Sequence, residues 1–422
     1  MHNNHRFDLS DYLLHFFRDV DQLGDKAIVF PQSMGLHSLD DDSLLPAGYL
    51  LRAALRNGRL WATWSKRGTA RTIFGPNPAV CFTEMPIAAL LEAGQARRAK
   101  GEAMSPFALA FPKEALHKLG ARPAIYGLSS DTRPPDGTDG GPRLLPEVSL
   151  PLIEQYRYVS HFYGQKKTVD WTHEREWRWP YRGEIKSADV AYDMDGIPPA
   201  DWRDIPGLDF YEEGILGIGV IVETEGQANK IISDMLTLVD RGDAIDKTFG
   251  FVLVRSRLPS TVRLRDWNHL AAQIEGAKVN LDPHFAMTTS KSRAYTEEFA
   301  KLVTQVEHSA GEANYRTHDI HGGCWLWLQD NTARLTRALV KTGRAFVTQD
   351  GRYLASLDEF SGARSLRQRQ EMTARLAKLV EQKFRTPGCY FSVPGTDDPD
   401  AIVFHSDVVE GDLDFFNCSW DY

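Results

Sequence analysis

The sequence predicts a mixed α/β protein of the α+β kind, with a separate α+β domain at its C-terminal end. Short apolar runs alternate with helical patterns in the first half, and residues 206–262 follow a β-α-β order. The chain has 422 residues, which is too long for one ordinary core. We therefore predict three parts: residues 1–205, an α/β extension and helical connector at 206–309, and a C-terminal domain at 310–422.

The composition is typical of a folded protein in a reducing compartment. Hydrophobic residues make up 42% of the chain and charged residues 25%, the usual balance for a soluble globular protein. No apolar run approaches the roughly 18–20 residues of a transmembrane helix, and the first residues lack the order of a signal peptide. The four cysteines form no CxxC pair, so we expect a cytoplasmic protein without membrane contact. The net charge of −8 requires any contact with nucleic acid to be local.

The first predicted elements are bounded by glycine and proline. Residues 11–17, DYLLHFF, are apolar enough for a strand or for the first turn of a helix. Residues 47–58 place leucines at helical spacing, and Gly58 is a typical helix end. The segment AVCFTEMP predicts a buried strand that Pro86 closes, and the next thirteen residues, IAALLEAGQARRA, predict a helix.

The following segments predict further α/β structure. Residues 106–127 predict a strand, a short helix and a second strand, and the Gly/Pro-rich residues 129–151 predict a long loop. Beyond residue 206 comes an apolar strand, an amphipathic helix and another strand, in the segments GILGIGVIVET, ANKIISDMLTLVD and TFGFVLVRS.

A basic helical run in the C-terminal part is the strongest local cationic feature. Its apolar face comprises Leu366, Met372, Leu376, Leu379 and Val380. Such a run is either the solvated face of a surface helix or a contact with nucleic acid or an acidic partner. The basic residues that would make this contact are Arg364, Arg367, Arg369, Arg375 and Lys378.

Familiar nucleotide and metal motifs do not fit the sequence. The glycines of GILGIG precede a strand, whereas a dinucleotide fingerprint follows one. His318, His321 and Cys324 have ligand-like spacing for a helix, but the glycine pair before Cys324 argues against a helix there. We therefore expect structural histidines and no metal.

The segment DWTHEREWRWP, residues 170–180, combines carboxylates with arginines and tryptophans. In a strand, Thr172, Glu174, Glu176 and Arg178 share one face, with the two carboxylates roughly 6–7 Å apart. Two such carboxylates can take different roles if their environments separate their pKa values. The alternative is a solvated sheet edge whose glutamates and arginines form ordinary ion pairs. The segment alone leaves both interpretations open.

Several segments occur in an order that resembles a known family. SDYLLHFF, LLRAALRNG, AVCFTEMPIAALLE, FALAFPKEALHKLGARPAIYG and EREWRWP together look like the AbiGi-type abortive-infection family of phage-resistance proteins, over about residues 9–180. The sequence departs from that family at Phe17, where threonine is expected, and in its Gly/Pro-rich loop. The layout is also similar, more remotely, to DarT-like ADP-ribosyltransferase toxins.

The second resemblance implies that residues 1–205 form an ADP-ribosyltransferase-like catalytic domain, with two small sheets that clasp NAD as substrate. By this carry-over Glu176 binds the 2′-hydroxyl of the nicotinamide ribose, Glu174 orients the acceptor, and His15 bonds a ribose. Breaking the nicotinamide–ribose bond develops positive charge at the anomeric carbon, which a fixed carboxylate stabilises. The further NAD contacts that we expect are Arg67 or Arg71 on the pyrophosphate and Tyr126 or Tyr163 on the nicotinamide.

The function expected from these resemblances is that of a bacterial anti-phage toxin or effector that modifies nucleic acid or protein, with its C-terminal domain recognising the target or a neutralising partner. One alternative is an inactive interaction module, such as an antitoxin or phage sensor. Another is a metal-independent nuclease that uses His15, His161 or His173 as acid and base.

Overall fold

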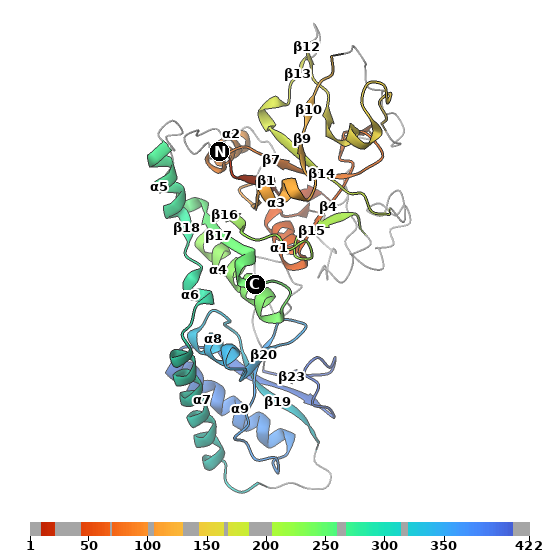
Figure 1. Cartoon of the computed structure of the whole chain (residues 1–422). Helices are drawn as coiled ribbons and strands as arrows, with labels where there is room; N and C mark the ends of the chain where they lie inside the picture. The colour runs from red at the N-terminus through yellow and green to blue at the C-terminus, as the bar shows by residue number, and fades with distance from the viewer. Residues whose placement is uncertain are drawn as a thin grey trace. The chain divides into compact units, whose positions relative to one another are not determined.

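A computed structural model of the chain shows a mixed α/β fold of the α+β kind, which confirms the predicted class (Figure 1). The chain divides into a first unit, Met1–Ala228 with Lys247–Val279, and a second unit, Asn229–Asp246 with Asn280–Tyr422. Helix α4 (Glu225–Arg241) begins in the first unit and continues in the second. The structure describes residues 10–21, 44–67, 70–99, 105–129, 143–163, 168–184, 205–259, 267–313 and 320–407.

The first unit is built on an eight-stranded sheet in the order β18-β17-β16-β8-β1-β7-β14-β9. Strands β16 and β17 pair in parallel, and the other neighbouring pairs are antiparallel. The eight strands are β1 (Tyr12–Phe16), β7 (Ala79–Thr83), β8 (Ala108–Pro112), β9 (Arg122–Pro123), β14 (Glu176–Pro180), β16 (Ile218–Val222), β17 (Phe249–Val254) and β18 (Lys278–Val279).

Shorter elements surround this sheet. Its helices are α1 (Ala47–Asn57), α2 (Ile87–Arg98), α3 (Lys113–Lys118) and α5 (Trp267–Ala277), with 3-10 turns η2 (Leu152–Arg157), η3 (Thr172–Glu174), η5 (Asp246–Thr248) and η6 (Arg255–Arg257). The two-stranded pairs are β2 (Val20–Asp21) with β3 (Leu44–Leu45), β4 (Arg59–Trp61) with β15 (Gly207–Asp209), β5 (Lys66–Arg67) with β6 (Ala70–Arg71), β10 (Ile125–Tyr126) with β11 (Tyr158–Val159), and β12 (Phe162–Tyr163) with β13 (Thr168–Val169).

The observed sheet differs from the expected domain arrangement. Strand β16 pairs with β8, so β16, β17 and β18 extend the sheet begun by the N-terminal strands and do not form a separate part. The physical reason is that β16 and β17 are buried apolar strands, which need neighbours on both edges and cover on both faces. The resemblance implies two small sheets, whereas the described strands include this single broad one.

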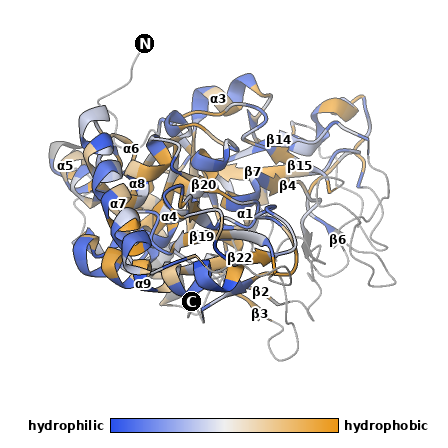
Figure 2. Ribbon diagram, turned by 90° about the horizontal axis from the view of Figure 1, so that it is seen from below, coloured by the Kyte–Doolittle hydropathy of each residue, from blue (hydrophilic) through white to orange (hydrophobic). Residues whose placement is uncertain are grey.

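The second unit packs helices on one antiparallel sheet, in the order β20-β21-β19-β22-β23. Its core joins helical residues such as Phe299, Leu339 and Leu376 to Leu326 of the central strand. Helix α9 carries both hydrophilic and hydrophobic residues around its circumference (Figure 2), and its predicted apolar residues are buried except for the partly buried Leu379. The elements are α6 (Asp282–Phe285), α7 (Thr289–Ser309), α8 (Arg334–Lys341), α9 (Leu366–Phe384), β19 (Gly322–Leu328), β20 (Ala345–Val347), β21 (Tyr353–Ala355), β22 (Gly388–Pro394) and β23 (His405–Ser406).

The predicted helix end at Gly58 is confirmed, and its geometry predicts the effect of Gly58→Ala on stability. Gly58 has φ of +66°, and a Cβ there would lie 2.4 Å from the ring of Tyr211, whose hydroxyl donates to Leu55 O. Gly58→Ala combines left-handed strain of about 1–2 kcal/mol with this clash, so we expect a larger loss of stability than strain alone gives.

Gly214→Ala is the matched control, because Gly214 has φ of +63° and open space around the added Cβ. Thermal unfolding compares the two variants. Equal losses of stability in the two variants would contradict the close packing of Tyr211 over Gly58.

Candidate active site

The segment around the two glutamates is a turn followed by a strand. Thr172–Glu174 form the 3-10 turn η3, and β14 begins only at Glu176. The expectation that Thr172 and Glu174 share a strand face with Glu176 is therefore wrong. The cause is Asp170, whose Oδ1 accepts hydrogen bonds from the backbone N–H and the hydroxyl of Thr172 and so bends the chain.

Between the glutamates, Arg175 has a left-handed backbone with φ of +46°. This conformation is costly for a residue with a side chain and persists only where surrounding contacts impose it. The hydroxyl of Thr83 donates to Glu174 O at 2.5 Å, and the N–H of Glu84 donates to Arg175 O at 3.0 Å. The CFTE and EREW segments, far apart in sequence, thus hold each other in place.

Glu176 is fixed by a buried arginine. Arg178 Nε donates to Glu176 Oε1 at 2.8 Å and Nη2 donates to Oε2 at 3.1 Å. Arg178 is 4% exposed, and its Nη1 also donates to the carbonyls of Tyr156 and Tyr158. A carboxylate has about four acceptor sites; Arg178 uses two and the Cys81 thiol also hydrogen-bonds to Glu176, which leaves about one for another partner. The Glu176 side chain is 20% exposed, which keeps it accessible.

Tyr126 lies beside the same carboxylates. Its hydroxyl oxygen accepts the backbone N–H of Glu176 at 2.7 Å. Burial raises the pKa of Tyr126, and the negative charges of Glu176 and Glu174 act in the same direction. The structure thus brings together three of the residues that the sequence singled out, Glu174, Glu176 and Tyr126.

Glu84 supports this site from the other face of the sheet, and the sequence did not single it out. Its side chain accepts hydrogen bonds from Trp177 Nε1 and Lys113 Nζ, both at 2.9 Å, and lies 3.7 Å from Arg175 Nη2. The available signal was its position directly after the buried strand β7, where a carboxylate ends an apolar run. Glu84 links β7, β14 and α3 at one end of the sheet.

His15 is not brought to the glutamates. The register pairs Leu14 with Thr83 and Thr83 with Glu176, so these three share one face of the sheet and His15 faces the other. His15 packs against the ring of Phe82, and its Nδ1 lies 2.9 Å from Cys81 O. Burial lowers the pKa of His15, as expected for a neutral structural histidine.

The other expected NAD contacts are dispersed. Arg71 is 6% exposed and its guanidinium lies 4.1 Å from the centre of the Trp64 ring. Tyr163 is 72% exposed on the β12–β13 hairpin and donates its hydroxyl hydrogen bond to Asp170. Arg67 lies in β5, and its side chain falls outside the described residues.

The low pKa of Asp170 predicts how the stability of the folded state depends on pH. Hydrogen bonds from Thr172 and Tyr163 lower the pKa of Asp170 to about 2, from about 3.9 in an unfolded chain. The pKa of Asp170 is lower in the folded chain than in the unfolded chain, so the ionised carboxylate stabilises the folded state. This stabilisation is complete above about pH 4 and is lost as the pH falls through about 2. We expect the ¹³C carboxyl signal of Asp170 to titrate near pH 2; a midpoint near 4 would show that these hydrogen bonds are absent in solution.

The basic residues of the C-terminal helix have different surroundings. Arg364 is buried and its Nε lies 2.9 Å from Glu307 Oε2, and Arg369 donates to Gly322 O at 2.6 Å. Both contacts lie within the second unit, and Arg364 belongs to its core, because a buried guanidinium needs its acceptors. Arg367, Arg375 and Lys378 are exposed and carry what remains of the predicted basic surface.

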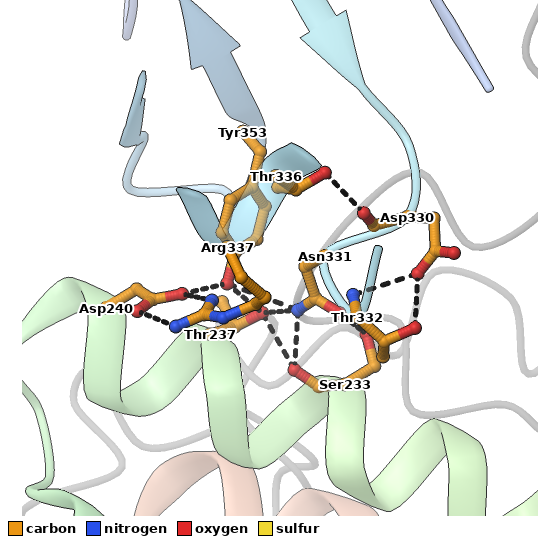
Figure 3. Close-up of polar contacts among 9 residues, drawn as sticks. All are labelled: Ser233, Thr237, Asp240, Asp330, Asn331, Thr332, Thr336, Arg337 and Tyr353. Carbon is orange, nitrogen blue, oxygen red and sulfur yellow. Dashed lines mark hydrogen bonds and ion pairs between the residues drawn. The ribbon is translucent and has the colours of Figure 1, made fainter. Parts of the chain in front are cut away.

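A buried polar network ties α4 to β21, to α8 and to the segment between β19 and α8 (Figure 3). Asp240 accepts two bonds from Arg337 and one from the hydroxyl of Tyr353 at 2.8 Å. Asn331 donates to Ser233 O and to Thr237 Oγ1 at 2.8 and 3.0 Å. Burial raises the pKa of Tyr353, which therefore remains a neutral donor.

Comparison with known proteins gives one match. Residues 287–418 match a family described as a protein of unknown function, DUF4427. No curated protein and no solved structure matches the chain. Within the described ranges, the helices are all too short or too polar to span a bilayer, and no three His, Cys, Asp or Glu side chains gather as metal ligands would. The family match covers most of the second unit but excludes its α4 residues.

Proposed function

We propose that the first unit is an NAD-dependent ADP-ribosyltransferase-like enzyme of anti-phage defence, with Glu176 and Glu174 as its acidic residues. The observation that carries this proposal is the fixed, partly exposed carboxylate of Glu176, paired with Arg178 beside Tyr126. The left-handed turn at Arg175 supports it, since imposed strain of this kind clusters at functional sites.

The chemistry suits this arrangement. An oxocarbenium-like transition state carries positive charge at the anomeric carbon of the ribose, and a preorganised carboxylate stabilises it more than the ground state. A remaining acceptor site of Glu176 would bind the ribose 2′-hydroxyl, while Arg178 holds the carboxylate in a fixed orientation. Glu174, 22% exposed on the adjacent turn, would orient the acceptor. The half-buried ring of Tyr126 offers a surface for nicotinamide.

Two residues that the sequence predicted as NAD contacts, His15 and Arg71, do not fit this site. We assign no substrate contact to His15, which faces away from Glu176, or to Arg71, which is buried against Trp64. Arg67 remains the proposed pyrophosphate contact. The second unit is proposed to recognise the target or a partner through Arg367, Arg375 and Lys378, which are exposed on α9.

Calorimetric titration of NAD into the full-length protein, with nicotinamide release assayed in parallel, tests this proposal. We expect saturable binding and steady release of nicotinamide. If the protein neither binds NAD nor releases nicotinamide, the proposal is wrong. The Glu176–Arg178 ion pair would then be structural, and the chain would be an interaction module such as an antitoxin or phage sensor.

A further inference from the structure

A histidine and an aspartate face each other across the β12–β13 hairpin. The register pairs Phe162 with Val169 and Tyr163 with Thr168, so continued pairing sets His161 opposite Asp170. His161 Nε2 lies 3.8 Å from Asp170 Oδ1, beyond direct hydrogen-bond length and close enough for the carboxylate to attract a proton on Nε2. Both side chains are partly exposed, at 26% and 34%. A solvent-accessible histidine with an orienting carboxylate is the arrangement used for proton transfer.

Asp170 is held firmly in this position. Its Oδ2 accepts the hydroxyl of Tyr163 at 2.8 Å, and its Oδ1 accepts the hydroxyl of Thr172 at 2.6 Å. The ring of Tyr163 also meets that of His161 edge to face, with centroids 5.3 Å apart. The groups that face His161 on the hairpin are therefore Asp170 and Tyr163, and the carboxylate remains ionised at neutral pH.

The hairpin is connected directly to the candidate active site. Asp170 bends the chain into the turn that carries Glu174, four residues later. Just before the hairpin, at the end of β11, Val159 O accepts the N–H of Gly127, and a Cβ on Gly127 would lie 3.4 Å from His161 Cβ. His161 therefore packs against the residue that follows Tyr126. In Figure 1 the hairpin lies next to β10, at the same end of the first unit.

We infer that His161, oriented by Asp170, is the general base that removes the proton from the attacking hydroxyl during the transfer of ADP-ribose. This inference rests on the proposed function and names the residue that deprotonates the acceptor. The bond from the ribose anomeric carbon to the nicotinamide nitrogen breaks, and its electron pair leaves with neutral nicotinamide. A bond from the acceptor oxygen to that carbon forms, and the acceptor proton moves to the free ring nitrogen of His161, then to solvent.

The other two histidines that sequence analysis considered are less suited to this role. His15 faces the opposite side of the sheet from Glu176 and is buried. His173 is 62% exposed and lies 3.5 Å from Glu174, without a fixed hairpin partner across from it. Because His173 contacts Glu174, the control for removal of an imidazole is His269→Ala, which changes an exposed histidine on α5.

Nicotinamide release from NAD, with water as the acceptor, tests the inference on the full-length protein. His161→Ala is expected to lower the release rate at saturating NAD about 100-fold, the lower end for loss of a general base. His161→Gln, which keeps more of the side-chain volume, should do the same. Added imidazole should restore part of the rate to His161→Ala, and calorimetry should show unchanged NAD binding. His269→Ala should match wild type.

A second readout is independent of turnover. In the ¹⁵N-histidine NMR spectrum of the free protein, we expect His161 to carry its proton on Nε2, the nitrogen that faces Asp170, and Asp170→Asn should remove this preference. Normal release by His161→Ala, or a loss that imidazole does not relieve, would overturn the inference alone. Absence of release by the wild type would overturn the proposed function and the inference with it.

Discussion

Replacing Glu176 by glutamine is expected to lower nicotinamide release about 100- to 1000-fold, the usual cost of removing one preorganised electrostatic contact to a transition state. Glutamine keeps the shape of the side chain and one acceptor oxygen but removes the negative charge that faces the anomeric carbon. NAD binding should change much less, because the charge on the ribose develops only in the transition state. Rapid-quench measurement of nicotinamide at saturating NAD gives the rate directly.

Two further variants make this result interpretable. Glu147→Gln changes an exposed glutamate of the same unit and should leave release unchanged. Glu176→Gln removes the charge that faces buried Arg178, so thermal unfolding must confirm that the variant is folded. Glu174→Gln leaves that ion pair intact and should lower transfer to an acceptor more than NAD binding. If both Glu176→Gln and Glu174→Gln release nicotinamide at the wild-type rate, these glutamates have only a structural role at the edge of the strand.

Replacing Arg337 by methionine is expected to destabilise the second unit by about 3–5 kcal/mol, the usual cost of leaving a buried charge unpaired. Asp240 is 5% exposed and Arg337 13%, so water compensates little for the missing guanidinium. The double variant Asp240→Leu/Arg337→Met should recover much of the loss, because it removes both charges.

Hydrogen exchange of the α8 backbone, residues 334–341, measures this effect locally in the intact chain. Arg367→Met is the control, since Arg367 and Glu371 form an exposed pair that contributes at most about 0.5 kcal/mol. Similar exchange in Arg337→Met and Arg367→Met would mean that the network of Figure 3 does not stabilise the unit. A large effect would establish that the DUF4427 region depends on α4, which lies outside the residues 287–418 that match the family.

Local chemistry explains what the sequence predicted correctly. Gly58 ends α1 because a left-handed residue can cap the last carbonyls, and glycine adopts that conformation without strain. The β16-α4-β17 order follows from apolar runs separated by a helical pattern, and the apolar face of α9 follows from its 3.6-residue period. Each of these features depends on neighbouring residues alone.

What the sequence could not predict depends on contacts between distant segments. The face on which His15 lies is set by the register of β1 with β7, and a shift of one residue would reverse it. Arg364 belongs to the core because Glu307, 57 positions earlier, receives its guanidinium. The turn at Arg175 is imposed by Thr83 and Glu84, so the strand pattern of DWTHEREW was misleading.

The most direct test of a catalytic role for Glu176 is the ratio of the nicotinamide release rates of wild type and Glu176→Gln. Both rates are measured at equal NAD occupancy. Calorimetry sets the occupancy, so the ratio reports the chemical step alone. If Glu176 stabilises the transition state, the ratio is about 100 or more and NAD binding is retained. A ratio near one, in a wild type that does release nicotinamide, would show that Glu176 takes no part in the chemical step.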